Sequence, residues 1–483
     1  MSNFSTILLN ADPNQVAYVY QSQIYTIKDI QSMTWGKVNA LIKKQVTPGQ
    51  RILLIANDSV DWITVFWALS IIGCCIIILH PKTSKDIIKN ICNKHSIDAV
   101  ITDNDLICDN SKCININQLI SKTSCAVSPY NYSSHEAFVC FSTSGTSGFP
   151  KLTVHTNYSL LNWGNTMTSF YQRVSINKNK IILCLASMSF AVGFMTNIIG
   201  TMFTGVRSVV GVSPIEIRRL DQLCDEFSVA AILLTPYVLE LILNSKNKLS
   251  SKNLEMIISG AEPLPDFLVE KFNKKFNLPI INTYGMSETC ITFSEFNCHK
   301  SNSIGRPLNT IDIKIINDNG VSCKINEIGT LYKKTAGQTI GYLDNLTATS
   351  ELLVNGWVNT NDQVSRDRDG DIIFHGRKNS CIKHKGQWIS LLEIESIILK
   401  IEDVKNCVVL QTISELGISK IVAFISKIDC NTVIKKSDIQ KILIRKFKKS
   451  HLTSDNIKFI EDIPLTVNAK KIRNYDVVVK KLL

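Results

Sequence analysis

The sequence has no cysteine framework, although fifteen cysteines are scattered along its 483 residues. None of them has the spacing of a zinc site or the paired pattern of a disulfide-rich secreted domain, so both classes are excluded. Scattered cysteines of this kind are typical of small buried side chains in a reducing compartment. We therefore expect a cytoplasmic protein.

No segment predicts export or a membrane anchor. The first residues lack a basic start followed by an apolar run, so no secretion signal is expected. The longest apolar stretch, Ile63–Leu79, is nearly long enough to cross a bilayer, but Gly73 interrupts it. The first half fits a buried helix and Cys74–Leu79 fits a core strand, so we favour a helix followed by a strand over a transmembrane segment.

The chain also lacks a basic stripe interleaved with aromatic residues. Its formal net charge is +12, and residues 435–473 hold eleven Lys or Arg against four Asp or Glu. Without interleaved aromatics this excess does not favour nucleic acid, and we expect no nucleic-acid partner. A solvated basic face, a phosphate-rich small molecule or an acidic carrier protein would each explain it.

The pattern of hydrophobic runs predicts an α/β protein of two domains. Short aliphatic runs alternate with helical patterns through the first two-thirds, which favours parallel sheets covered by helices. These runs are Arg51–Ala56, Ala99–Thr102, Ala137–Phe141, Ile181–Leu185, Ala231–Thr235 and Glu255–Ser259. From about residue 300 to 375 the pattern changes to short strands and turns, which predicts a small β-rich subdomain. We place the boundary after residue 378, so that 1–378 form a large domain and 379–483 a small α+β domain.

A run of hydroxyl and glycine residues follows the apolar run Ala137–Phe141. The segment Thr143–Lys151 offers flexible backbone N–H groups, hydroxyls and a terminal cation, which is the chemistry that a polyphosphate requires. Its spacing is not that of the usual P-loop, and a Ser/Gly surface loop is the alternative. The residues expected to hold phosphate are Thr143, Ser144, Gly145, Thr146, Ser147, Gly148 and Lys151.

This loop resembles the signature of the acyl-adenylate-forming superfamily, which includes acyl- and aryl-CoA ligases, luciferases and peptide-synthetase adenylation domains. The family pattern is Thr-Ser-Gly-Thr-Thr-Gly-x-Pro-Lys-Gly. Here Ser147 replaces a threonine and keeps the hydroxyl, whereas Leu152 replaces the last glycine. The resemblance implies a large domain of two parallel-type α/β subdomains with a β-rich subdomain, followed by a mobile small domain.

Further segments resemble the nucleotide-binding motifs of the same family, in family order. Ser259–Leu264 resembles the segment along the adenine, and it implies contacts from Gly260, Ala261 and Glu262. Asn282–Thr289 resembles the Tyr-Gly-x-Thr-Glu motif and implies a nucleotide role for Asn282, Thr283, Tyr284, Gly285, Ser287 and Glu288. By this likeness Tyr284 stacks on adenine, Ser287 binds the α-phosphate and Glu288 holds Mg²⁺.

Trp357–Asp362 resembles Trp-x-x-Thr-Gly-Asp, which implies that Asp362 accepts both ribose hydroxyls. Asn361 stands where glycine is usual, and Asn tolerates left-handed backbone better than most residues. The resemblance also implies that Arg377 reaches the ribose or phosphate. A surface salt bridge is the alternative for an Asp or Arg taken alone.

The last hundred residues resemble the small domain of this family. Asn379 matches the hinge, Gly386 the channel that the pantetheine arm passes, and Lys383 a residue that assists thioester formation. Pro464–Arg473 resembles the segment with the catalytic lysine, which aligns with Lys470. Ala469 and Lys471 depart from the pattern, so the alternatives of Lys471 in this role, or of a basic tail, stay open.

The acid pocket is expected at Ser189–Phe194, and the resemblance assigns to it Phe190, Ala191, Gly193 and Phe194. Amino-acid-activating relatives carry Asp where this chain has Ala191, and an unpaired ammonium would be costly there. An aryl or medium-chain acid is therefore favoured over an α-amino acid. Core packing is an equally weighted alternative for Phe190 and Phe194.

The resemblance thus implies an ATP-dependent acid–thiol ligase. With ATP and Mg²⁺ a carboxylic acid would form an acyl-AMP and release pyrophosphate, and the acyl group would then pass to the thiol of CoA. One alternative acceptor is the phosphopantetheine of an acyl carrier protein. Another alternative is a non-catalytic relative that binds nucleotide or acyl-AMP.

Overall fold

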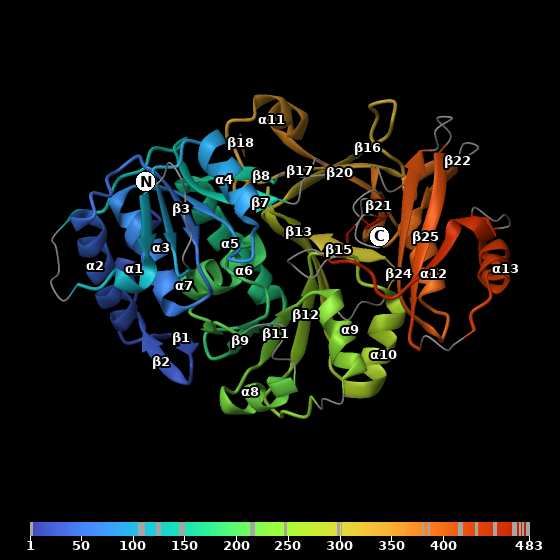
Figure 1. Cartoon of the computed structure of the whole chain (residues 1–483), viewed down its shortest axis with the longest axis horizontal. Coiled ribbons are helices and arrows are strands. Elements are labelled where there is room, and N and C mark those ends of the chain that lie inside the picture. Colours follow the sequence, from blue (N-terminus) through green and yellow to red (C-terminus); the bar gives the residue numbers. More distant parts are fainter. Residues whose placement is uncertain are drawn as a thin grey trace.

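The computed structural model describes residues 3–104, 112–121, 127–143, 150–212, 218–245, 249–296, 300, 302–378, 381–384, 387–413, 419–429, 433–447, 452–465, 471–472, 475 and 478–479. They form an elongated molecule in which the first strands and helices lie at one end and the C-terminal strands at the other (Figure 1). The expected α/β class is confirmed, with two large sheets flanked by helices.

A seven-stranded sheet contains the first predicted strands. Its order is β18-β8-β7-β4-β3-β5-β6, and the five strands from β7 to β6 are parallel. The strands are β3 (Arg51–Ile55), β4 (Cys75–Ile78), β5 (Ala99–Thr102), β6 (Lys112–Asn115), β7 (Ala137–Thr143), β8 (Lys151–Thr156) and β18 (Gly341–Tyr342). β8 runs antiparallel to β7, so the phosphate segment joins two paired strands rather than a strand and a helix.

The long apolar stretch forms the predicted helix and strand. Helix α3 (Val60–Ile72) begins at Ser59, whose side chain accepts from the backbone N–H of Trp62, and ends at Gly73 with a φ of 101°. Every residue of α3 except Asp61 is buried, and β4 follows it directly. Among the described residues no helix is long and apolar enough to cross a membrane.

The second sheet is larger than the sequence predicts. Parallel strands β9 to β13 form its centre, and the N-terminal strand β1 pairs with β10 here rather than with the first sheet. Beyond β13 the sheet continues through β14 and β15 into the β-rich strands, which gives fourteen strands in all. The predicted β-rich subdomain is therefore an extension of this sheet.

Its strands are β1 (Val16–Tyr20), β2 (Gln23–Thr26), β9 (Ile181–Cys184), β10 (Arg207–Val209), β11 (Ala231–Leu234), β12 (Met256–Gly260), β13 (Ile280–Met286), β14 (Cys290–Phe296), β15 (Ser303–Pro307), β16 (Asp312–Ile316), β17 (Gly329–Lys334), β19 (Leu353–Val354), β20 (Trp357–Arg366) and β21 (Ile372–Arg377). The helices around the two sheets are α1 (Ser5–Asn10), α2 (Ile27–Lys43), α4 (Lys85–Lys94), α5 (Asn157–Arg173), α6 (Ala191–Phe194), α7 (Thr201–Thr204), α8 (Leu220–Glu226), α9 (Pro236–Asn244), α10 (Asp266–Phe276) and α11 (Leu346–Leu352).

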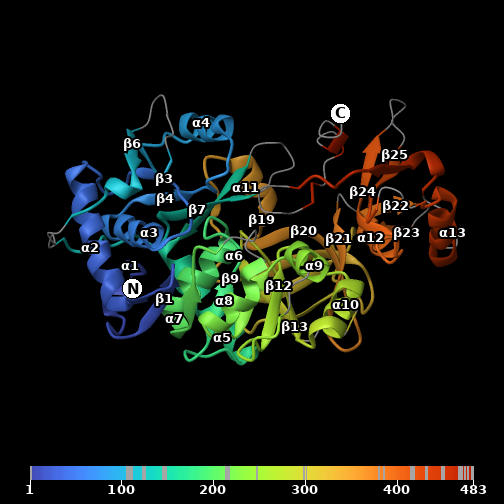
Figure 2. The same ribbon diagram turned by 60° about the horizontal axis from the view of Figure 1, so that its bottom comes forward.

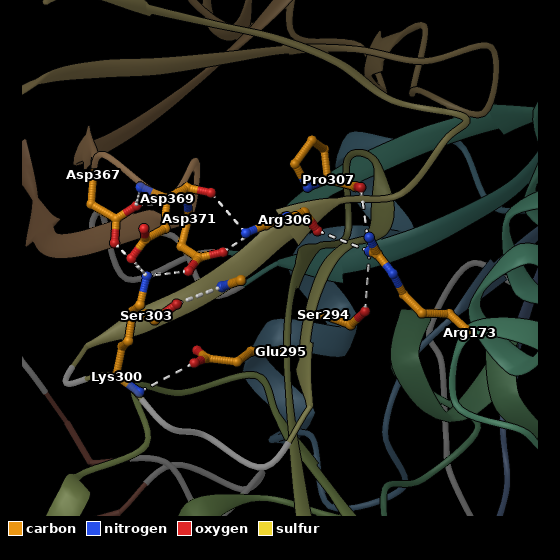
Figure 3. A network of polar contacts seen from close by, with 11 residues as sticks. Arg173, Ser294, Glu295, Lys300, Ser303, Arg306, Pro307, Asp367, Asp369 and Asp371 are labelled. Atoms are coloured by element: carbon orange, nitrogen blue, oxygen red, sulfur yellow. Dashed lines mark hydrogen bonds and ion pairs between the residues drawn. The ribbon is translucent and has the colours of Figure 1, made fainter. Parts of the chain in front are cut away.

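A network of ion pairs fixes the loop before β15 against the turn between β20 and β21. The Lys300 ammonium lies 2.8, 2.7 and 2.5 Å from carboxylate oxygens of Asp367, Asp369 and Asp371 (Figure 3). Arg306 Nε also lies 2.7 Å from Asp371. The hydrogen bond from Lys300 lowers the pKa of Asp367. The three carboxylates could hold a metal ion, but the lysine already fills their centre.

Removing this internal cation should make the turn respond to a metal. Lys300→Met leaves three acidic groups close together, so we expect a Tm a few degrees lower in metal-free buffer. Millimolar Ca²⁺ should restore part of the loss in this variant and leave the wild type unchanged. Thermal unfolding with Ca²⁺ and with a chelator tests this, and an equal response of both proteins to Ca²⁺ would contradict it.

The last part of the chain has a sheet and a core of its own. Its elements are β22 (Cys381–His384), β23 (Gln387–Ser390), α12 (Leu391–Ile398), β24 (Val404–Ile413), β25 (Ser419–Lys427), α13 (Lys436–Phe447) and β26 (Ile457–Ile460). Strands β24, β25 and β26 pair in this order, with α12 and α13 packed on them. Phe267 of α10 packs against this core, and α10 lies beside it in both views (Figures 1 and 2).

Candidate active site

Three segments meet at the predicted metal residue, Glu288. Tyr342 of β18 donates from its hydroxyl to Glu288 Oε1 at 2.7 Å. The Lys151 ammonium, at the start of β8, lies 5.1 Å from the centre of the Tyr342 ring. Glu288 is 6% exposed, and its main-chain oxygen accepts from the N–H of Thr339 at 2.7 Å. A predicted phosphate residue and the predicted metal residue therefore share one tyrosine.

A second cluster joins the predicted base and ribose residues. Tyr284 donates from its hydroxyl to Asp362, and Arg377 Nε lies 2.9 Å from Asp362 Oδ1. Asp362 and Arg377 face each other across β20 and β21, and Asp362 is 2% exposed. The Asp362 charge raises the pKa of Arg377, and burial followed by that same charge raises the pKa of Tyr284. The phenol stays protonated and the guanidinium charged.

A lysine that the sequence analysis missed lies between the two clusters. Lys333 of β17 donates to Thr289 Oγ1 at 2.7 Å and to Thr292 Oγ1 at 3.2 Å, and its ammonium lies 4.8 Å from the centre of the Tyr284 ring. The only sequence signal was its place two residues after Leu331, on the same face of a strand. Tyr342, which was also missed, had no signal of its own.

The strand ends around this site have constrained backbones. A Cβ on Gly260 would lie 2.4 Å from Thr283 Oγ1, so a larger residue there would displace the Thr283 hydroxyl, which donates to the Ser259 carbonyl. Ala261 has a φ of 69° and Asn361 a φ of 57°, both left-handed. The backbone at Asn361 thus has the left-handed conformation that glycine adopts most readily. Glu262, which directly follows Ala261, is half-buried.

The ends of the phosphate segment are described and its centre is not. Thr143 donates from its hydroxyl to the Lys151 carbonyl at 3.2 Å, while Ser144, Gly145, Thr146, Ser147 and Gly148 lie outside the described residues. Leu152, which replaces the family glycine, is 1% exposed and packs in the core behind β8.

The motif with Tyr284 is tied to its surroundings by main-chain contacts. His155 of β8 places Nε2 2.8 Å from the Ser287 carbonyl, and burial lowers the pKa of His155 to about 4, so the ring is neutral and Nε2 donates. Asn282 donates to the Ser303 carbonyl at 2.9 Å. Gly285 lies in β13 opposite Ile291 of β14.

The predicted acid-pocket segment divides between surface and core. Phe190 stacks on His80 with ring centres 5.3 Å apart. Phe194 is fully buried and meets Phe66 and Phe141 edge-on, so it belongs to the core. Ala191 is 8% exposed, and a Cβ on Gly193 would lie 2.1 Å from the Ser187 carbonyl. Gly193 is required for packing.

A half-buried carboxylate, also missed from the sequence, anchors this segment. Asp58, which follows β3, accepts from Ser187 Oγ at 3.0 Å and from the Met188 N–H at 3.1 Å. Burial raises its pKa from 3.8 to about 6, although both hydrogen bonds act in the opposite direction.

The pKa of Asp58 predicts a pH-dependent stability. The folded state binds this proton more tightly than the unfolded chain, so Asp58 lowers the free energy of unfolding as pH rises through the range between the two pKa values. Asp58→Asn removes the charge and keeps an acceptor oxygen. We expect the variant to gain about 1 kcal/mol over the wild type at about pH 7.5 and nothing at about pH 3, where the carboxyl is protonated in both states. Urea unfolding at both pH values measures this, and equal differences at the two would refute it.

Most of the site residues predicted in the last hundred residues lie outside the described part of the chain. Asn379, Gly386 and Lys470 lie outside the described residues, and Lys383 is described only as part of β22, opposite Trp388 of β23. Lys471, the alternative to Lys470, donates from its ammonium to the Cys407 carbonyl at 3.0 Å. That bond attaches Lys471 to β24.

Proteins of known function match almost the whole chain. The 2-succinylbenzoate–CoA ligase of Bacillus mycoides is 22% identical over 471 residues, with 95% of each chain covered. Gramicidin S synthase 2 of Aneurinibacillus migulanus is 24% identical over 95% of this chain, which spans only about 10% of that synthase.

Solved structures share the fold. The anthranilate CoA ligase AuaEII in complex with anthranoyl-AMP superposes with a TM-score of 0.86 at 20% identity, covering 99% of this chain and 97% of the other. The o-succinylbenzoate CoA synthetase of Bacillus subtilis, in complex with its acyl-adenylate, gives 0.87 at 19% identity with 98% of both chains covered.

The family model of the AMP-binding enzyme matches residues 9–343, which is more than half of the chain. Together with the match in fold and with the order of the motifs, this shows that the protein belongs to the AMP-binding enzyme family.

Proposed function

We propose that the chain is an AMP-forming acid–thiol ligase that activates an aryl carboxylic acid and transfers the acyl group to CoA. The observation that carries the proposal is the convergence of Lys151, Glu288, Asp362 and Arg377, which come from strands far apart in the sequence. CoA ligases of aromatic acids are among the relatives that match nearly end to end.

In this proposal the nucleotide is held by charge and stacking. The Asp362 carboxylate would accept from the ribose hydroxyls, Tyr284 would stack on the base, and Arg377 and Lys151 would face the phosphates. Because attack by the substrate carboxylate needs no protein nucleophile, these residues act by positioning and by charge neutralisation. Phosphate oxygens at Ser144–Gly148 would receive backbone and hydroxyl hydrogen bonds.

The residues around Glu288 fit a magnesium ion. Tyr342 bonds only Oε1, so within the described part of the chain Oε2 is left for a hard cation, and a carboxylate is a ligand that Mg²⁺ prefers. The ion would supply neutralisation of the phosphate charge.

The second half-reaction would use the small domain. We infer a boundary after residue 378, with Asn379 as the hinge. Rotation about it would remove Lys470 from the site and bring Gly386 and Lys383 to the thiol. Such a rotation is supported by the core of residues 391–457, whose buried members all come from the last part of the chain.

The proposed acid is aryl rather than an α-amino acid. Near Phe190 the stacked His80 ring is kept neutral because burial lowers its pKa to about 4, and Ala191 offers no charge to an ammonium group. A flat, mainly apolar acid has the lowest desolvation cost when it packs against uncharged side chains such as Phe190, His80 and Ala191.

A second candidate acceptor is the phosphopantetheine of an acyl carrier protein. The match to an adenylation region of gramicidin S synthase 2 favours it, as does the basic segment 435–473.

One assay separates these functions. Acid-dependent exchange of labelled pyrophosphate into ATP should be measured with aryl, medium-chain and amino acids, and thioester formation should then be measured with CoA and with a holo-carrier. We expect exchange with aryl acids and thioester with CoA. Exchange only with amino acids would overturn the substrate class, thioester only with the carrier would favour the second candidate, and no exchange at all would favour a non-catalytic binding protein.

A further inference from the structure

Lys333 is an unusual group for the interior of a protein. Its side chain is fully buried, and among the described residues it forms no ion pair with a carboxylate. Burial lowers the pKa of Lys333 to about 7, with Asp362 and Glu288 acting in the opposite direction. An apolar residue of similar size would avoid this desolvation cost, so the ammonium has no evident role in stability.

Within the described part of the chain, the hydrogen bonds and the cation–π contact of the Lys333 side chain all go to the segment Tyr284–Thr292. The ammonium donates to Thr289 Oγ1 and Thr292 Oγ1, and Thr292 in turn donates from its hydroxyl to the Tyr284 carbonyl at 3.2 Å. The Lys333 ammonium also lies 4.8 Å from the centre of the Tyr284 ring. Thr289 directly follows the proposed metal residue Glu288. The Lys333 ammonium therefore contacts a residue on each side of Glu288, Tyr284 before it and Thr289 after it.

Lys333 adds a cation to the contacts that hold the Tyr284 ring. Phe293 meets the ring edge-on at 5.5 Å, the Phe374 ring lies tilted to it at 6.2 Å, and the hydroxyl is held by Asp362. An ammonium against the ring is attracted to its negative face and holds it in place.

We propose that Lys333 is a positioning residue that couples the base side of the nucleotide site to its metal side. It keeps the Tyr284 ring and the Glu288–Thr289 turn in one mutual arrangement, so that magnesium-bound ATP meets both at once. This inference rests on the nucleotide roles proposed for Tyr284 and Glu288. It adds a residue that contacts neither the nucleotide nor the ion.

The test compares Lys333→Met with Lys334→Met, an exposed neighbour on the same strand. Calorimetric titration at about pH 6, where Lys333 is charged, with ATP in excess Mg²⁺ gives the Kd, and thermal unfolding without ligand at the same pH gives the Tm. We expect Lys333→Met to weaken ATP binding about tenfold while its ligand-free Tm equals or exceeds that of the wild type, since a costly buried charge is gone. Lys334→Met should change neither.

A second variant covers the case in which Lys333→Met does not fold. Thr292→Val keeps the shape of the side chain and removes the hydroxyl between Lys333 and the Tyr284 carbonyl, so ATP binding should weaken about threefold. If the wild type binds ATP and both variants bind it within twofold of the wild type, the coupling is refuted and the proposed function stands. A lower ligand-free Tm with unchanged Kd would show a structural role only and would also refute it. If the wild type itself binds no ATP, both proposals fail.

Discussion

Replacing Lys470 with alanine is expected to lower acid-dependent pyrophosphate exchange by about 10²–10³-fold, because the ammonium would face the charge that builds up at the α-phosphate. Thioester formation from supplied acyl-AMP should continue near the wild-type rate, since the proposed second half-reaction uses other residues. Separate assays of pyrophosphate exchange and of thioester formation measure the two effects. Both assays use the acid that supports exchange in the wild type.

The neighbouring lysine decides the register of the segment. Lys471 is bonded to the Cys407 carbonyl, so Lys471→Ala should keep most of the exchange activity and lose at most a few-fold. If Lys471→Ala loses exchange and Lys470→Ala retains it, the assignment moves by one residue. Loss of both half-reactions in Lys470→Ala would instead indicate damage to the whole small domain.

The second large effect is expected from Asp362→Asn. The amide keeps the shape but removes the charge that Arg377 pairs with, and it presents only one acceptor oxygen to Tyr284 and the ribose. Because hydrogen bonds to charged groups contribute more than neutral ones, kcat/KM for ATP should fall about 100-fold. The KM for the acid should change little, since Asp362 would contact the nucleotide alone.

The matched control is Asp312→Asn, on the exposed side of β16 in the same sheet. It should leave kcat/KM for ATP unchanged. The measurement is initial-rate kinetics with ATP and the acid varied in turn. If Asp362→Asn raised the KM of both substrates equally, or affected neither, the ribose role would be wrong.

The local sequence was sufficient to predict secondary structure where a segment consists almost entirely of apolar residues. Ala99–Thr102 forms a strand with the predicted ends, and the apolar stretch Ile63–Leu79 forms the end of α3 followed by β4. In each case short β-branched runs or a capped apolar helix allow one conformation, whatever the strand later pairs with.

Pairing between distant strands was not accessible in the same way. The sequence does not indicate that β1 joins β10, that β8 runs antiparallel to β7, or that β15 connects the β-rich strands to the parallel sheet. The pairings of Tyr18 with Ser208 and of Ser303 with Ile373 join distant residues, for which one sequence carries no periodic signal. β7 and β8 are neighbours in the chain, but periodicity does not indicate the direction in which they pair.

The sequence alone determined the family chemistry of this protein: the hydroxyl-rich segment, the carboxylates and the arginine occur in a fixed order, and residue type with local spacing was enough to name them. Only the tertiary structure decided which groups support them. Tyr342 donates a hydrogen bond to Glu288, Asp58 accepts one from Ser187 of the predicted acid-pocket segment, and the Lys333 ammonium contacts the Tyr284 ring. These contacts form because segments distant in sequence pack side by side. A side chain acquires such a role from the partner that packing brings to it, and that partner cannot be identified from its own neighbours in the sequence.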